Sequence, residues 1–272
     1  MVDGAGPDVS FKALLLTHYF GMSQETGAIV EFCRDRGLAL IEDCSHACFG
    51  VAGDRTIGTI GDYAVASPYK FFALQDGGIL VANRGAALPA SMPLSPGPGA
   101  ELRGMGRGVK AALERWRDRV QSGDIACLDG ALGSLCGRSL PKAVEFEREE
   151  GTYSSLYDKA EEGRGGLSGS RWLMRSSDVA RLARRRRTHY RRWAEAVDGL
   201  PNCRALFPNL PDACVPYMFP LYIDHPAPHF DLLKHLGVPL WRWDEMAVSA
   251  CKVASDYRLH LIHLPCHQNL HP

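Results

Sequence analysis

The feature that most constrains the fold is a pair of short apolar runs with one amphipathic segment between them. Residues 13–18 form a continuous apolar run, which is typical of a strand buried on both faces. Residues 24–36 carry apolar side chains at helical spacing, between a capping serine, Ser23, and a terminating glycine, Gly37. Residues 38–42 are the next strand. The sequence therefore predicts a strand–helix–strand unit, in which the two strands are parallel neighbours.

In sheets of this kind, ligands bind beyond the carboxyl ends of the strands. Asp43 directly follows the second strand and is therefore expected at that edge. Residues 63–67 and 79–82 are predicted to be further strands, and the loop between them contains Lys70. Gly77-Gly78 permits a close backbone turn before the last of these strands. Asp43 and the Lys70 loop are the candidate functional region.

Lys70 is the residue that most limits the possible reactions, because an acid and an imidazole precede it in the sequence. Asp43 ends an apolar strand, His46 follows three residues later, and Lys70 lies in a Gly-rich loop. These are the three groups needed to hold and tune a pyridoxal phosphate ring. The lysine bonds to the aldehyde, the carboxylate keeps the ring nitrogen protonated, and the imidazole stacks on or hydrogen-bonds the ring. The plain alternatives are an exposed loop lysine and an acid that caps a turn.

Composition excludes several other classes of protein. The chain has 272 residues, of which 46% are hydrophobic and 23% charged, enough for one large α/β domain or two smaller ones. The formal net charge is zero, so no overall positive field attracts nucleic acid. Neither a long apolar span nor a signal-peptide pattern occurs, and the nine scattered cysteines favour reduced thiols. We expect a cytoplasmic protein that binds neither nucleic acid nor membrane.

The middle of the chain has a different composition. Residues 85–108 are rich in Gly, Pro, Ala and Ser, which predicts a loop or an interdomain connection. Residues 110–120 are predicted to form a short charged helix, and residues 130–169 carry little periodic signal. This stretch is therefore expected to connect two domains.

Helices and strands alternate again in the last third. Ser177 is predicted to open a long amphipathic helix. Residues 216–223 are a predicted strand, and Pro220 within it favours a sheet edge. A short helix and a further strand are expected over residues 229–235 and 238–241. The pattern predicts a second, smaller α/β domain.

Several segments, in their order and spacing, resemble a known family of enzymes. The residues that carry the resemblance are 17–21, 42–47, 58–63 and 67–78. They are similar to those of the DegT/DnrJ/StrS-type aminotransferases, pyridoxal phosphate enzymes of the aspartate aminotransferase (type I) fold. Most members of that family aminate keto sugars attached to nucleotides. Later segments, 184–193, 214–220 and 264–268, resemble the small domain of the family.

The resemblance implies a role for each residue of the candidate region. Lys70 would be the Schiff-base lysine, and later the group that moves a proton between substrate and cofactor. Asp43 would pair with the pyridinium nitrogen, and His46 would contact the phenolic oxygen of the ring. Relatives with histidine in place of the lysine perform dehydration instead, and Lys70 speaks against that reaction.

The sequence departs from the family pattern in three places. Many members have a serine five residues before the lysine that contacts the cofactor phosphate, and here that residue is Val65. Ser67 is the candidate replacement. The chain also begins after the family's phosphate-binding turn and stops at Pro272, before its usual last helix. We therefore expect an N-terminally truncated member of the family.

The resulting expectation is an α/β protein with a partial type I fold. Residues 1–95 would form a partial large domain with a parallel-rich sheet that binds pyridoxal phosphate, 96–170 a connecting region, and 171–272 a small C-terminal domain. The implied reaction moves an amino group from an amino acid, with glutamate as the expected donor, to a keto sugar, expected to be nucleotide-linked, in polysaccharide or secondary-metabolite biosynthesis. A homodimer is expected. The competing class is a catalytically impaired remnant that keeps the fold but does not hold the cofactor phosphate.

Other residues that could carry chemistry have plainer readings. Thiol and imidazole side chains could act as metal ligands, and the candidates are Cys44, His46, Cys48, His260, His263 and His267. Their spacing is not that of a zinc site, so no metal is expected. The arginines of residues 184–187, with Arg191 and Arg192, are expected to form a solvated helix face rather than a nucleic-acid patch. The alternative is that one of them reaches a substrate phosphate or carboxylate. Residues 241–243 (Trp-Arg-Trp) either line a sugar pocket or pack the small domain. His18 either belongs to the site or makes a structural hydrogen bond.

Overall fold

The computed structural model describes residues 10–74, 76–88, 95–121, 159, 163–235, 238, 240–243 and 250–270, without the side chains of 111–121, 227–229, 232 and 235. The chain divides into two compact units. The first consists of Met1–Ser95, Gly165–Val179 and Pro211–Tyr217, and the second of Pro96–Arg164, Ala180–Leu210 and Met218–Pro272. The functional domains predicted with boundaries at residues 95 and 170 stay a prediction.

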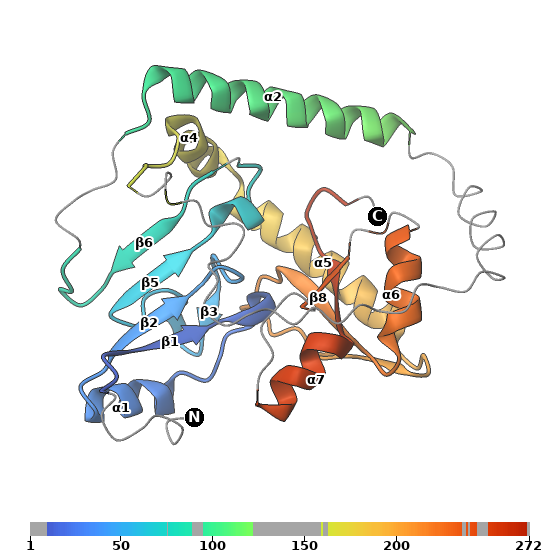
Figure 1. The fold of residues 1–272 in the computed structure, drawn as a ribbon, viewed down its shortest axis with the longest axis horizontal. Helices are drawn as coiled ribbons and strands as arrows, with labels where there is room; N and C mark the ends of the chain where they lie inside the picture. The colour runs from blue at the N-terminus through green and yellow to red at the C-terminus, as the bar shows by residue number, and fades with distance from the viewer. Residues whose placement is uncertain are drawn as a thin grey trace. The chain divides into compact units, whose positions relative to one another are not determined.

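The first unit is built on a four-stranded sheet. Its strands are β1 (Ala13–Thr17), β2 (Ala39–Asp43), β5 (Tyr63–Ala66) and β6 (Ile79–Ala82), in the order β1-β2-β5-β6 (Figure 1). β1 and β5 both run parallel to β2, whereas β6 is antiparallel to β5. The predicted strands and their parallel pairing are confirmed, and Asp43 is the last residue of β2. The expected burial of the first strand on both faces is wrong, because β1 is at the edge of the sheet and Leu15 is 60% exposed.

Helix α1 (Gly27–Asp35) packs against this sheet through a small apolar core of Leu16, Cys33 and Leu40. It begins three residues later than predicted, with Thr26 rather than Ser23 at its N-cap. The backbone N–H of Gln24 donates to Nδ1 of His18 at 3.2 Å, which explains why this segment does not join the helix. Gly37 follows the helix with φ +62°, the left-handed conformation expected of a terminating glycine.

A second apolar core lies under the segment between β2 and β5. It is formed by Cys44, Ala47, Ala52, Ile57, Ile60 and Ala64. The segment includes a small hairpin of β3 (Val51–Ala52) and β4 (Arg55–Thr56). The chain then leaves β5 and turns through the short 3₁₀ helix η2 (Pro68–Lys70).

Two segments distant in sequence complete the first unit. Helix α4 (Ser168–Ser176) begins beside the Lys70 loop, where the Asp76 carboxylate accepts hydrogen bonds from the Leu167 N–H, at 2.8 Å, and from the Ser170 hydroxyl. A carboxylate at this position stabilises the positive end of the helix dipole. The stretch 211–217 joins through backbone bonds, from the Val51 N–H to the Ala213 carbonyl and from the Tyr217 N–H to the Phe20 carbonyl.

The second unit has an antiparallel sheet of four strands. They are β7 (Cys203–Ala205), β8 (Met218–Ile223), β10 (Leu261–Pro265) and β9 (Trp241–Arg242), in the order β7-β8-β10-β9. Pro220 therefore lies in an inner strand, and its prediction as an edge marker is wrong. The regular pairing of β7 with β8 ends at Ala205, opposite Leu221, and the next residue, Leu206, donates its N–H to the Pro220 carbonyl at 3.0 Å. The bond that the missing proline N–H cannot make is therefore at the end of this ladder, where its loss interrupts no further pairing.

The helices of the second unit are α2 (Pro98–Gln121), α5 (Val179–Val197), α6 (Pro226–His235) and α7 (Lys252–His260). α2 starts within the segment predicted to be a loop, because Pro98 is favourable in a first helical turn and the Ala100 N–H bonds to the Gly97 carbonyl. In the described part of the chain, no helix combines the length and apolar character needed to cross a bilayer.

Gly21 allows a direct test of how closely residues 215–217 pack against the first sheet's loop. Its φ is +88°, and a Cβ there would lie 2.2 Å from the Val215 carbonyl oxygen. We predict that Gly21→Ala lowers the free energy of unfolding by more than about 3 kcal/mol, because backbone strain adds to a clash with backbone atoms. Urea unfolding followed by circular dichroism measures this change.

Gly37→Ala is the matched control, since φ is +62° but nothing lies within 4 Å of the added Cβ. It should cost only about 1–2 kcal/mol, the price of the left-handed backbone. Equal losses in the two variants would contradict the tight approach of residues 215–217 to Gly21.

Candidate functional site

The candidate site lies at the carboxyl edge of the first sheet. Asp43 ends β2 and is paired in register with Val65 of β5, the strand that leads through Ser67 into η2 and Lys70. Two adjacent parallel strands therefore deliver the carboxylate and the lysine to the same edge, as the sequence predicts. The buried side chains of Phe71 and Phe72 hold the lysine loop against the first unit.

Lys70 is a half-buried lysine rather than an exposed loop residue. Burial lowers its pKa from the ordinary lysine value, while the negative charge of Asp43 acts in the opposite direction. A lysine whose pKa is lowered is neutral more often near pH 7, and a neutral amine is what nucleophilic attack and proton transfer require. Its Nζ also lies 5.5 Å from the centre of the Tyr217 ring.

Asp43 also makes the local contact expected of a turn-capping acid. Its Oδ1 accepts a hydrogen bond of 2.9 Å from the Ser45 N–H. The Ser45 hydroxyl in turn accepts a bond of 3.2 Å from the hydroxyl of Ser67. The structure thus brings Asp43, Ser45 and Ser67 together, and the turn contact fixes the carboxylate where it influences Lys70.

His46 is surrounded by aromatic rings. Its imidazole lies 4.6 Å from the Tyr217 ring at an interplanar angle of 36°, and 6.2 Å from each of the rings of Tyr19 and Phe20. Because Tyr217 also faces the Lys70 amine, this one ring connects the predicted imidazole to the predicted lysine. The side chain of His46 is thereby placed at the site by stacking.

A buried carboxylate, Glu42, supports the site from beneath. Its Oε1 accepts bonds from the N–H groups of Ile60 (2.7 Å) and Gly61 (2.8 Å), and its Oε2 from the N–H of Gly58 (3.0 Å). Nε2 of His18 lies 3.2 Å from Oε2. Since the Gln24 N–H donates to the other ring nitrogen, Nε2 carries the proton and donates to Glu42. His18 therefore makes a structural hydrogen bond, one of the two readings that its sequence position left open.

The ionisation of Glu42 follows from these contacts. Burial by itself would raise the pKa of this carboxyl, but the hydrogen bonds from His18, Gly61, Gly58 and Ile60 outweigh it and hold the pKa below the ordinary value. Four donors around one carboxylate make the charged form the stable one. Glu42 is therefore an anion that orders the loop, and its oxygens face inward.

The same contacts explain a cluster of potential metal ligands. Among the described residues, one ligand atom from each of His18, Glu42 and Cys44 lies within 4.8 Å of the others. The oxygens of Glu42 are already bonded, and burial, with Glu42 and Asp43 adding to it, raises the pKa of Cys44 to about 12. A protonated thiol is a poor metal ligand. The cluster is accounted for by packing and hydrogen bonding.

Two further predictions concern the second unit. Arg186 is fully buried and its Nε donates to Gln268 at 2.7 Å, so the prediction of a solvated arginine face is wrong for this residue. His263 packs edge-on against Trp243 at 4.7 Å, and burial lowers its pKa to about 4. Trp243 therefore makes a packing contact, while Trp241 is 47% exposed.

Residues that the sequence did not single out complete the site. Tyr217 reaches it from a segment that follows the long helix α5, and no local pattern links it to Lys70. In the sequence Asp76 is only one residue of a longer motif, and its bond to the start of α4 depends on the folded chain. Glu42 offered one signal, a carboxylate inside an apolar strand, which is costly unless it is bonded.

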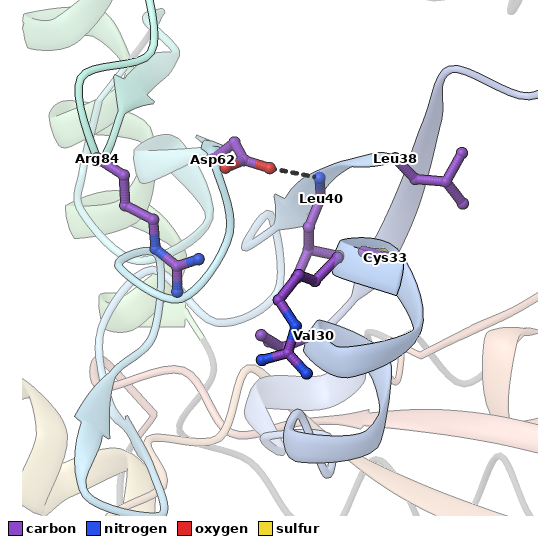
Figure 2. Close-up of a pocket in the computed structure, with 7 residues that line it drawn as sticks. Val30, Cys33, Leu38, Leu40, Asp62 and Arg84 are labelled. Atoms are coloured by element: carbon purple, nitrogen blue, oxygen red, sulfur yellow. Dashed lines mark hydrogen bonds between the residues drawn. The ribbon is translucent and has the colours of Figure 1, made fainter. Parts of the chain in front are cut away.

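A separate hollow lies at the opposite edge of the sheet. It measures about 420 Å³ and is lined by Val30, Cys33, Arg34, Leu38, Leu40, Asp62 and Arg84. Figure 2 shows it between α1 and the loop of Asp62, whose carboxylate accepts the Leu40 N–H at 2.8 Å. Leu40 is near the start of β2, whereas Asp43 ends it. None of the residues predicted to bind cofactor lines this hollow.

Comparisons with known proteins agree with this geometry. Residues 8–95 match the sequence model of the DegT/DnrJ/EryC1/StrS aminotransferase family. Over 149 residues the chain is 33% identical to a dTDP-4-dehydro-2,3,6-trideoxy-D-glucose 4-aminotransferase of Saccharopolyspora spinosa, covering 52% of this chain and 38% of that protein. It is 27% identical over 141 residues to a GDP-perosamine synthase of Vibrio cholerae, covering 51% of this chain and 36% of that protein.

Solved structures show the same fold. The aminotransferase TlmJ of Streptoalloteichus hindustanus superposes with a TM-score of 0.57 at 23% identity, over 99% of this chain and 63% of that one. PseC of Helicobacter pylori, an aminotransferase in pseudaminic acid biosynthesis, gives a TM-score of 0.58 at 16% identity, over 96% of this chain and 62% of that one. The chain thus spans less than two thirds of these relatives.

The fold is therefore that of the α/β pyridoxal-phosphate-dependent aminotransferases, with a mostly parallel sheet followed by an antiparallel C-terminal one. Within that class, the matched segment contains Asp43, His46 and Lys70. Residues 8–95 thus match the DegT/DnrJ/EryC1/StrS aminotransferase family, whose members use pyridoxal phosphate.

We predict that Glu42→Gln lowers the free energy of unfolding by about 2–4 kcal/mol, because an amide nitrogen would replace one of the oxygens that face backbone N–H groups. The effect should also depend on pH. Since the folded-state pKa of Glu42 is below its ordinary value, its contribution is present above that value and is lost as the pH falls through the lowered pKa. Urea unfolding at a series of pH values measures both effects.

Glu31→Gln is the control, because Glu31 is an exposed carboxylate on α1. It should change the free energy of unfolding by less than about 0.5 kcal/mol. If Glu42→Gln were as stable as this control, or lost as much stability in acid as the unsubstituted protein, the structural role of Glu42 would be wrong.

Proposed function

We propose that this chain carries the cofactor-binding lysine of an aminotransferase that moves an amino group from an amino acid, with glutamate as donor, to the keto group of a nucleotide-linked sugar. The observation that supports it best is the pairing of Asp43 with Lys70 at one sheet edge. Burial lowers the pKa of the lysine, while the charge of the carboxylate acts in the opposite direction. These are the two groups on which the chemistry of such an enzyme depends.

The residues at the site fit the ring of pyridoxal phosphate. Asp43 offers an anionic oxygen for a protonated ring nitrogen, Lys70 an amine for the aldehyde, and His46 an imidazole among aromatic side chains. Ser67, hydrogen-bonded to Ser45, offers hydroxyl groups for the phosphate. When bound, the cofactor supplies an electron-withdrawing ring that stabilises negative charge on the substrate carbon.

The residues of the chain divide the work in a simple way. Asp43 would lie against the ring nitrogen of the bound cofactor, where a carboxylate favours the protonated form of that nitrogen. Lys70 would accept a proton on Nζ from the α-carbon of the amino-acid donor and later give it back. Its lowered pKa allows the neutral amine that this transfer needs. His46, held among aromatic side chains, would contact the phenolic oxygen of the ring.

The substrate class is proposed from the relatives. The two curated proteins described above are named for a dTDP-linked and a GDP-linked sugar. A structure of DesI, matched with a TM-score of 0.54, was solved with its TDP-sugar product. We propose a keto sugar on a nucleoside diphosphate for this chain also, and a cytoplasmic homodimer as the working form. Light scattering on the purified protein tests the dimer.

The first test is covalent attachment of the cofactor. We predict that the protein incubated with pyridoxal phosphate develops the visible absorbance of a lysine adduct, that borohydride makes the adduct permanent, and that Lys70→Ala abolishes it. Lys12→Ala is the control, because Lys12 is exposed and precedes β1, and it should leave the absorbance unchanged. A folded protein without this absorbance would contradict the proposal and favour a non-catalytic remnant of the fold.

The second test separates the acid from the lysine. We predict that Asp43→Asn still forms the adduct but transfers the amino group of glutamate about 10²–10⁴-fold more slowly, because the ring nitrogen loses its anionic partner. Stopped-flow absorbance after mixing with glutamate gives this rate. Asp62→Asn is the control, since this acid bonds the Leu40 N–H at the other edge of the sheet. Equal rates in Asp43→Asn and the unsubstituted protein would contradict the assigned role.

A further inference from the structure

Tyr217 lies in a segment that resembles the small domain of the family, but neither a motif nor that resemblance gives it a role at the site. It lies in a stretch far along the chain from Lys70, yet it belongs to the first unit. Its ring contacts two of the predicted functional side chains, with the His46 ring at 4.6 Å and Lys70 Nζ at 5.5 Å from its centre. A third neighbour is the fully buried Phe71, at 5.7 Å.

The backbone around Gly21 holds Tyr217 in this place. The Tyr217 N–H donates to the Phe20 carbonyl at 2.8 Å. Phe20 has φ +60° and Gly21 φ +88°, and a left-handed conformation is uncommon for a side chain as large as Phe20. A Cβ on Gly21 would come within 3.0 Å of the Tyr217 nitrogen. Strained backbone of this kind persists where the surrounding structure requires it, and here it seats residues 215–217.

The contact between the Tyr217 ring and Lys70 favours the protonated form of the lysine. The face of an aromatic ring is negative and attracts an ammonium group within about 6 Å of its centre. Asp43 is the charged group that faces the lysine from β2, and it also favours the ammonium form, whereas burial disfavours it. Tyr217 therefore adds to Asp43 in this balance, and its other contact, with His46, lies on the same ring.

We propose that Tyr217 is a positioning residue of this site, whose ring holds the Lys70 amine and the His46 imidazole in place and stabilises the protonated amine before the lysine reacts. The inference rests on the proposed function only in taking Lys70 as the working amine. It assigns to residues 211–217 the role of completing the site. The consequence is that the ring face of Tyr217, rather than its hydroxyl, matters for the state of Lys70.

The test measures the reactivity of Lys70 without cofactor. Brief acetylation across the alkaline range, followed by mass spectrometry of peptides, gives the pH at which the Lys70 amine becomes reactive. We expect Tyr217→Leu to lower this midpoint by roughly half a pH unit, because the ammonium loses its attractive face. Tyr217→Phe, which keeps the ring, should retain the original midpoint. Asp43 and His46 are present in every variant, so their contributions are shared.

Tyr69→Leu is the matched control, because Tyr69 precedes Lys70 in η2 and is 52% exposed. Its midpoint should equal that of the unsubstituted protein. If Tyr217→Leu fails to fold, fluorinated phenylalanines at position 217 replace it, since they keep the shape of the ring and weaken its negative face. Their midpoints should fall in steps with the number of fluorine atoms.

The outcomes separate this inference from the proposed function. An unchanged midpoint in Tyr217→Leu or along the fluorinated series, or equal shifts in Tyr217→Phe and Tyr217→Leu, would overturn the role of the ring face. Absence of a pyridoxal phosphate adduct in the unsubstituted protein would overturn the proposed function, and the acetylation midpoint would still report on Tyr217. An adduct together with an unmoved midpoint would refute the inference alone.

Discussion

The buried carboxylate of Glu42 is the interaction on which the site depends. It sits in the middle of the sheet and accepts three backbone N–H groups from the loop before β5, as well as a ring N–H from His18 after β1. One side chain therefore joins three consecutive parts of the first unit. Asp43 is the next residue of the same strand, and successive side chains of a strand point to opposite faces. The buried position of Glu42 thus determines that the Asp43 side chain points to the opposite face of the strand.

Much of the first unit follows from local pattern. The apolar runs predict β1 and β2, and parallel pairing then places Asp43 and the Lys70 loop at one edge without knowledge of any contact. What the pattern could not give is the aromatic surroundings of His46, because Tyr217 comes from far along the chain and its approach depends on the backbone of Phe20 and Gly21. The pattern also places the start of α1 too early, since a contact of His18 with Gln24 takes the expected capping region out of the helix.

In the second unit, predictions made from one type of residue failed where strand pairing and long-range contacts decided the structure. Proline usually marks an edge strand, but Pro220 lies in an inner strand, opposite the point where the regular pairing of β7 ends. A run of arginines usually marks a solvated face, but Arg186 is buried and bonded to Gln268, a residue near the end of the chain. Both exceptions depend on partners distant in sequence. They show why the strands and helices were easier to predict than the contacts between them.

The central claim is that Lys70, and no other lysine of the chain, is the amine that bonds to pyridoxal phosphate. Its most direct measurement is a peptide map, by mass spectrometry, of the protein reduced with borohydride in the presence of substoichiometric cofactor. A phosphopyridoxyl group confined to the peptide that contains Lys70 is the result that this account predicts. The same group spread over exposed lysines such as Lys12, or absent from Lys70, would contradict it.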